Sequence, residues 1–194
     1  MERVKIASIH GRFQPFHNGH LDYALQAFER ADFISVGLAQ IFKPRFNEDE
    51  KGRNSVSANP LSFEQRSNLV KAALLEAGID RTRFDIIPFP IEQPSRLREF
   101  VRPGMVCFTT QLNPWNAEKI RLLEREGFEV IRLRVSEIDG KRVATGTTIR
   151  ELIRSGDQSW QRFVPPAVFE LIGSEYLEHF KLGTVPTLSA LSSP

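Results

Sequence analysis

The sequence predicts an α/β domain built on a doubly wound parallel sheet of five strands, with further helices toward its C-terminal end. Short apolar runs alternate with stretches of helical periodicity along most of the chain. The 194 residues suit one domain of ordinary size, and neither an internal repeat nor a change of composition divides them. A hydrophobic fraction of 41% and a charged fraction of 26% are ordinary for a globular protein.

Five apolar runs have the length of buried strands. They are Val4–Ile9, Phe33–Leu38, Phe84–Pro88, Met105–Thr109 and Glu129–Leu133. Because helical stretches separate them, the strands are expected to lie parallel. Ligands of such sheets bind beyond the carboxyl ends of the strands, where the strand order reverses. The loop after the first strand is therefore the first place to look for a site.

The helices are marked by periodicity and by their end signals. The expected ranges are 19–31, 62–78, 95–101, 113–127 and 147–155, with two further stretches around Val168 and Tyr176. Ser62 and Gln65 have the spacing of a capping box, and Asn113-Pro114 is a typical helix start. We expect one domain over residues 1–182, an inserted mobile loop over 43–58, and a loose C-terminal tail over 183–194.

Composition excludes several classes of protein. A net charge of +2, from 26 basic and 24 acidic residues, gives no support for binding nucleic acid by bulk charge. The single cysteine, Cys107, excludes an internal disulfide and a cysteine-based zinc site. The chain has neither an apolar run long enough to cross a membrane nor the apolar segment of a signal peptide. We therefore expect a cytoplasmic enzyme.

The first loop and the helix start that follows it read GRFQPFHNGH over residues 11–20. The N–H groups and dipole of a helix start favour an anion, and Gly11 and Gly19 allow close approach of a ligand to the backbone. His17 and His20 are three residues apart, so both imidazoles can project from one side of the first turn. This pattern suits phosphate oxygens. Two alternatives are structural histidines and a metal pair with His10 as a third ligand, although no fourth ligand is evident.

A second helix start, late in the chain, has similar chemistry. The segment Thr145–Arg150 reads TGTTIR, with hydroxyl groups at the helix start and an arginine one turn later. Such a group can hold the phosphates of a nucleotide, with Arg150 as the charge partner. The alternative is an ordinary N-cap with a solvent-exposed arginine.

These two motifs resemble the signatures of the nucleotidylyltransferase superfamily. The string GRFQPFHNGHL looks most like archaeal-type nicotinamide-mononucleotide adenylyltransferases, and TGTTIR is similar to the family's Ser-x-Thr-x-x-Arg segment. Three weaker likenesses are Asn59–Arg66, Asn113-Pro114 and Trp160–Pro165, so that the resemblance covers roughly residues 4–172. It implies a Rossmann-like fold and an enzyme that joins a nucleoside triphosphate to a phosphate-bearing acceptor, with release of pyrophosphate.

The resemblance also implies roles for individual residues. His17, His20 and Arg150 would be catalytic, acting on the triphosphate and its transition state. The implied nucleotide and phosphate contacts are Gly11, Arg12, Phe13, Gln14, Gly19, Asn113, Thr145, Gly146, Thr147 and Thr148. Magnesium is expected on the nucleotide phosphates, largely bound to water, with no metal site made by the protein itself.

The acceptor is left open between alternatives. Adenylyl transfer from ATP to nicotinamide mononucleotide is the leading interpretation. However, the archaeal-type enzymes carry Asn-x-x-Trp after the third strand, and residues 91–98 contain no tryptophan here. Arg96 and Arg98 are therefore candidate contacts to an acidic acceptor, which favours cytidylyl transfer from CTP to a small phosphate or phosphonate. A third alternative is a nucleotide-binding sensor without catalysis. No nucleic-acid or membrane partner is expected, and whether the chain forms a homo-oligomer is left open.

Overall fold

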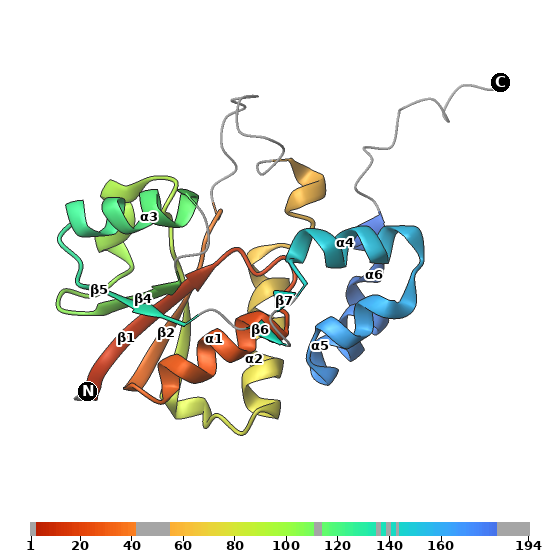
Figure 1. The fold of residues 1–194 in the computed structure, drawn as a ribbon, viewed down its shortest axis with the longest axis horizontal. Helices are drawn as coiled ribbons and strands as arrows, with labels where there is room; N and C mark the ends of the chain where they lie inside the picture. The colour runs from red at the N-terminus through yellow and green to blue at the C-terminus, as the bar shows by residue number, and fades with distance from the viewer. Residues whose placement is uncertain are drawn as a thin grey trace.

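The computed structural model describes residues 3–41, 55–110, 114–134, 137–138, 141–142 and 144–181. Its main strands are β1 (Val4–Gly11), β2 (Ala31–Leu38), β3 (Phe84–Pro88), β4 (Val106–Thr110) and β5 (Val130–Leu133). They form one sheet of five strands in the order β3-β2-β1-β4-β5, and every neighbouring pair is parallel (Figure 1). The predicted doubly wound sheet is thus confirmed, and the order reverses between β1 and β4.

The α-helices are α1 (Asn18–Phe28), α2 (Phe63–Glu76), α3 (Pro114–Arg125), α4 (Gly146–Ser155), α5 (Pro166–Leu171) and α6 (Leu177–Lys181). The 3₁₀ segments are η1 (Val56–Ala58), η2 (Arg81–Arg83), η3 (Pro94–Glu99) and η4 (Gln158–Phe163), and η5 (Ile172–Tyr176) is a π-helical turn between α5 and α6. The predicted capping box of α2 is present, because Ser62 Oγ accepts from Gln65 N and the Gln65 side chain accepts from Ser62 N.

Two local predictions differ from the structure. Residues 94–99 form the 3₁₀ segment η3 where a helix over 95–101 is expected, and short connecting segments commonly adopt this tighter helix. A short antiparallel pair, β6 (Glu137–Ile138) with β7 (Lys141–Arg142), was not predicted, since two-residue strands show no alternating pattern. Residues 43–54 and the expected tail 183–194 lie outside the described residues.

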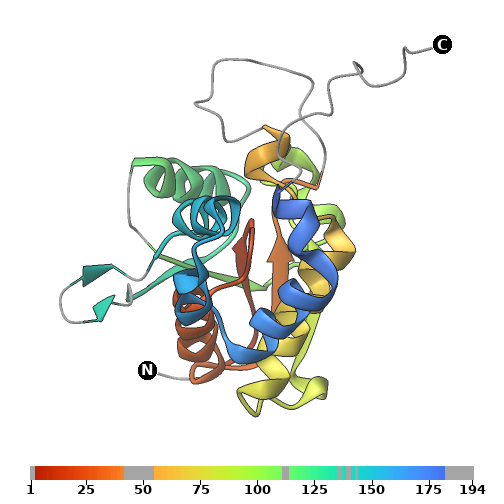
Figure 2. The ribbon, with the colours of Figure 1, turned by 90° about the vertical axis from the view of Figure 1, so that its right-hand side faces the viewer.

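Two hydrophobic cores cover opposite faces of the sheet. The larger core includes Ala7 and Ile9 of β1 and packs against α1, α2, α4 and the C-terminal helices. The smaller core lies between the sheet, η3 and α3, and includes Phe89 and Cys107. Figure 1 shows α3 on one side of the sheet with α1 and α2 on the other, and Figure 2 shows the C-terminal helices running beside α2. This division places α1 and α4 on the same face.

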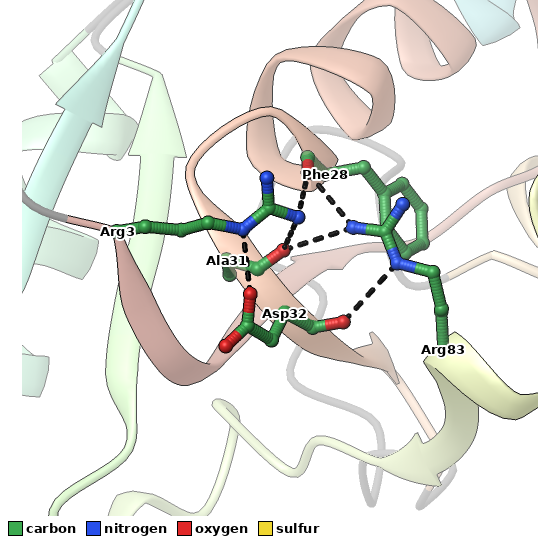
Figure 3. Close-up of polar contacts among 5 residues, drawn as sticks. All are labelled: Arg3, Phe28, Ala31, Asp32 and Arg83. Atoms are coloured by element: carbon green, nitrogen blue, oxygen red, sulfur yellow. Dashed lines mark hydrogen bonds and ion pairs between the residues drawn. The ribbon is translucent and has the colours of Figure 1, made fainter.

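Two arginines hold the end of α1 against the start of β2 (Figure 3). Both Arg3 and Arg83 donate to the backbone carbonyls of Phe28 and Ala31, over distances of 3.0–3.2 Å. Arg3 also pairs with the Asp32 carboxylate at 2.6 Å, while Arg83 donates to the Asp32 carbonyl at 3.2 Å. These bonds satisfy carbonyls that the end of a helix leaves without partners. They lie at the amino-terminal edge of the strands, away from the predicted site.

Candidate active site

The first loop is held in place by two phenylalanines that point into the core. Phe13 and Phe16 are almost completely buried, and their rings lie 5.4 Å apart. Phe13 has a φ of +51°, a left-handed backbone conformation that is costly for a residue with a side chain and persists only where packing enforces it. This turn brings the Phe13 ring against Gly11, where an added Cβ would lie 2.8 Å from a ring carbon. Gly11 is therefore needed for packing within the loop.

The two predicted catalytic histidines lie together at the start of α1. Their imidazole rings stack with centroids 3.6 Å apart and planes 23° apart. His17 is the N-cap residue, yet its side chain makes no capping hydrogen bond to the helix. The His20 ring also meets the Phe13 ring edge-on at 4.8 Å, which fixes its orientation. The pair is thus positioned by the same packing that holds the loop.

His20 is an uncharged hydrogen-bonding group at neutral pH. Burial lowers its pKa well below the usual value of 6.5, and the neighbouring His17 and Arg12 lower it further. Its Nδ1 atom is buried without a hydrogen-bond partner. A neutral imidazole carries one N–H donor, which suits a hydrogen bond to a phosphate oxygen.

The tip of α4 meets the first loop. Arg150 is 4% exposed and donates from Nη1 to the Gln14 carbonyl at 2.6 Å, and from Nη2 to Thr147 Oγ1 at 3.1 Å. At Gly146 an added Cβ would lie 2.9 Å from the Gln14 carbonyl oxygen, so the close approach requires glycine. Thr145 caps the helix by accepting from Thr148 N at 3.2 Å. The structure therefore brings together the two helix starts that the sequence singled out.

Positive charge is concentrated where these elements meet. The pKa of Arg150 is lowered to about 10, mainly by burial and next by the nearby Arg12. The pKa of Arg66 is also lowered to about 10 by burial, with Glu92 acting in the opposite direction and Arg12 in the same one. Arg12 thus repels two buried guanidinium groups. A bound polyphosphate would relieve this repulsion, because an opposite charge favours the charged forms.

Arg66 is a buried arginine beside the first loop, and the sequence alone assigned no role to it. It is 2% exposed and donates to the Ala39 carbonyl at 2.6 Å and to the Arg12 carbonyl at 2.9 Å. It thereby ties α2 to the loop after β1 and to the end of β2. Glu92 supports the same region by accepting from the backbone N–H groups of Gln40 and Ile41. The only sequence signal was the position of Arg66 at the end of the Asn59–Arg66 likeness.

Gln14 has a positioning role in this structure. Its side chain donates to the Leu61 carbonyl at 2.9 Å and accepts from the Leu61 N–H at 3.0 Å. Its own carbonyl accepts from Arg150. The side chain of Gln14 is therefore bonded to the segment before α2, and the ring of Phe13 is in the core. Any phosphate contact predicted for these two residues would come from their backbone N–H groups.

The arginines suggested for the acceptor lie elsewhere. Arg96 forms a two-pronged ion pair with Glu99 at 2.8–2.9 Å on the exposed side of η3. Arg98 donates to the carbonyl of Glu126 and lies over the ring of Phe128, 5.4 Å from its centroid. These contacts do not bring either side chain to the first loop, so they give the predicted acceptor role no support. Asn113 lies outside the described residues.

The described part of the chain contains no group of three or more histidine, cysteine or acidic residues placed to bind a metal ion. The donors around the two helix starts are imidazoles, guanidinium groups and hydroxyls, which suit an anion. A magnesium ion would therefore be held chiefly by nucleotide phosphates and water. Within the same residues, no helix is long and apolar enough to span a membrane.

Comparison with known proteins points to the same chemistry. A family model described as cytidylyltransferase-like matches residues 9–114. Phosphonoformate cytidylyltransferase from Streptomyces viridochromogenes is 34% identical over 169 residues, covering 84% of this chain and 88% of that protein. Nicotinamide-nucleotide adenylyltransferase from Pyrobaculum neutrophilum is 31% identical over 177 residues, covering 87% of this chain and 88% of that protein.

Solved structures agree on the fold. A bifunctional NMN adenylyltransferase/ADP ribose pyrophosphatase from Francisella tularensis superposes with a TM-score of 0.66 at 18% identity, covering 92% of this chain. This chain spans about half of that one, 52% of its length. At such low identity the likeness supports the arrangement of strands and helices alone.

Proposed function

This chain belongs to the cytidylyltransferase-like family of nucleotidylyltransferases, and on that premise we propose how its two helix starts carry out the transfer. The enzyme moves a nucleoside monophosphate from a nucleoside triphosphate to a phosphate-bearing acceptor and releases pyrophosphate. The observation that carries the site assignment is the bond from Arg150 to the Gln14 carbonyl. It places a guanidinium group from α4 beside the loop that presents His17 and His20.

The reaction is a displacement at the α-phosphorus. An oxygen of the acceptor forms a bond to this phosphorus while the bond to the oxygen bridging the α- and β-phosphates breaks. Pyrophosphate leaves with that electron pair. The protein's part is positioning and stabilisation of the charge that develops, as in other phosphoryl-type transfers.

Each side chain has a defined task in this scheme. His20, neutral because of its lowered pKa, donates its N–H to an α-phosphate oxygen, and the stacked His17 contacts the same phosphates. Arg150 and the hydroxyl of Thr147 hold the departing β- and γ-phosphates at the start of α4. Arg12 adds positive charge from the first loop. Magnesium carried by the phosphates supplies further neutralisation when it is bound.

For the substrates, the first candidate is ATP with nicotinamide mononucleotide, giving NAD. The support is that several relatives at 31–33% identity are nicotinamide-nucleotide adenylyltransferases. Their alignments cover most of this chain, so the likeness is not confined to the first loop.

The second candidate is CTP with a small phosphate or phosphonate. It is favoured by the 34% identity to phosphonoformate cytidylyltransferase and by the segment after β3. That segment has no tryptophan, and its Leu97 is fully buried in the smaller core. It therefore offers no exposed aromatic side chain for stacking on a nicotinamide ring.

Pyrophosphate release separates these candidates. The full chain is assayed with ATP and with CTP, each against nicotinamide mononucleotide and against phosphonoformate, in the presence of magnesium. Turnover of ATP with nicotinamide mononucleotide supports the first candidate, and turnover of CTP with phosphonoformate supports the second. Nucleotide binding without pyrophosphate from any of the four pairs would contradict both and favour a sensor.

A further inference from the structure

Strands β1 and β4 separate at the carboxyl edge of the sheet. Their pairing is confined to Ala7 with Val106 and Ser8 with Cys107. Beyond these pairs the hydroxyl of Tyr23 in α1 donates to the Phe108 carbonyl at 2.6 Å and accepts from the backbone N–H of His10. Tyr23 thus takes the place of the next bonds between the strands. This is the point where the strand order reverses and where ligands of such sheets bind.

The side chain of His10 lies on the opposite face of the sheet from α1. Its neighbour Ile9 is part of the larger core, whereas the His10 ring stacks on Phe89 of the smaller core, with centroids 4.3 Å apart and planes parallel. His10 is 5% exposed, and both of its ring nitrogens lack a hydrogen-bond partner. Leaving a buried polar group unsatisfied costs about 1–3 kcal/mol, so the contacts of the described residues do not account for a histidine here.

The charge of Lys119, in α3, acts on His10 from the same face of the sheet. Burial lowers the pKa of Lys119 to about 8, and its charge in turn lowers the pKa of His10, for which burial is the larger cause. None of the ion pairs formed by the described residues involves Lys119. The face under α3 therefore presents one ammonium group and one neutral imidazole that have no hydrogen-bond or ion-pair partner among the described residues, next to Gly11, where the first loop begins.

The position of His10 and Lys119 agrees with the direction from which the acceptor has to attack the α-phosphorus. An in-line displacement requires the incoming oxygen and the departing pyrophosphate on opposite sides of the α-phosphorus. The starts of α1 and α4, assigned to the triphosphate, both lie on the face of the larger core. An acceptor must then approach from the face of α3, where His10 and Lys119 lie.

We propose that His10 and Lys119 bind the anionic phosphate or phosphonate group of the acceptor and hold it for attack. This inference rests on the proposed nucleotidyl transfer. Lys119 neutralises the acceptor oxygens, and His10 supplies one N–H donor. The His10–Phe89 stack, at 4.3 Å, leaves no space for a ring of the acceptor between these two side chains.

The test compares Michaelis constants for the two substrates separately. Lys119→Met and His10→Leu are assayed with whichever nucleotide and acceptor the unmodified enzyme uses. Lys119→Arg tests whether a different cation at this position is enough to bind the acceptor. Lys71→Met and His179→Leu are matched controls, because Lys71 is exposed on α2 and His179 is exposed near the C-terminal end of the described chain.

We expect the acceptor KM to rise about 10-fold or more in Lys119→Met and His10→Leu, the loss of one charge-assisted bond. The nucleotide KM should stay unchanged, Lys119→Arg should recover part of the affinity, and both controls should behave as the unmodified enzyme. An unchanged acceptor KM, or equal increases for both substrates, would overturn the inference. If the unmodified enzyme releases no pyrophosphate with any acceptor, it is the proposed function that fails.

Thermal unfolding gives a second, independent measurement. Removing a buried ammonium group that has no ion-pair partner among the described residues should raise the melting temperature of Lys119→Met at pH 7 in the absence of substrates. A structural role would give the opposite result, a lower melting temperature with an unchanged acceptor KM. Because this measurement needs no turnover, it stays informative even if His10→Leu folds poorly.

Discussion

Arg150 donates a hydrogen bond to the backbone carbonyl of Gln14 at 2.6 Å, across 136 residues of sequence. The bond joins the start of α4 to the loop between β1 and α1. It fixes the separation between the groups assigned to the departing pyrophosphate and those assigned to the α-phosphate. Changes at this junction should therefore affect the nucleotide more than the stability of the fold.

Gly146→Ala tests the junction directly. The added Cβ would lie 2.9 Å from the Gln14 carbonyl oxygen and 3.3 Å from Arg150 Nη1, so α4 must move away from the loop. We expect the nucleotide KM to rise about 10-fold or more, because a small displacement of the phosphate-binding groups from their required positions weakens the interaction with the substrate. Gly173→Ala is the control, since a Cβ there meets nothing within 4 Å. Equal KM values in the two variants would show that the contact has no role in nucleotide binding.

His20→Ala should lower kcat on the order of 10²-fold, the usual effect of removing a donor aimed at developing charge. The ring of His20 packs on those of Phe13 and His17, so its removal also frees the stacked partner. Steady-state kinetics measures the change, with His179→Ala as the control for loss of an exposed imidazole. An unchanged kcat would refute the assignment of His20 to the transition state.

Arg66→Met should raise the nucleotide KM and lower the free energy of unfolding by about 3 kcal/mol. It removes charged hydrogen bonds to the carbonyls of Arg12 and Ala39 and leaves those acceptors buried. Arg83→Met is the matched control, because Arg83 also binds carbonyls but at the far edge of the sheet (Figure 3). Denaturant unfolding measures the free energy of unfolding of each variant, and steady-state kinetics measures its nucleotide KM. If both variants lose stability and neither changes KM, Arg66 has no positioning role.

Stability should fall as the pH drops below about 6.5, before most carboxylates titrate. Burial is the main cause that lowers the pKa of both His10 and His20 in the folded chain, well below 6.5. Below this pH the two imidazoles become protonated in the unfolded chain but stay neutral in the folded chain, so acid favours unfolding. Urea unfolding at pH 7.5, 6.0 and 5.0 measures the slope, which His10→Leu should reduce. A pH-independent stability across this range would contradict the lowered pKa values.

The sequence was most informative where structure is decided locally. The capping box of Ser62 and Gln65 and the five apolar strands depend on neighbouring residues, and the structure confirms both. What it could not supply was the pairing of distant side chains. Arg98 was a candidate contact to an acidic acceptor, but its side chain donates to the carbonyl of Glu126 after α3 and lies over the ring of Phe128. His10 was considered only as a metal ligand, because its stack on Phe89 depends on the pairing of β2 with both β1 and β3, which brings distant residues together.

The bond between Arg150 and Gln14 joins a loop that is synthesised early to a helix that is synthesised late. The first loop leaves the ribosome early, but its partner on α4 is synthesised only after most of the chain. A nascent polypeptide therefore has imidazoles in place long before it has the guanidinium group that holds the departing phosphates. Translation products that stop before α4 are expected to leave the cellular supply of nucleoside triphosphates untouched.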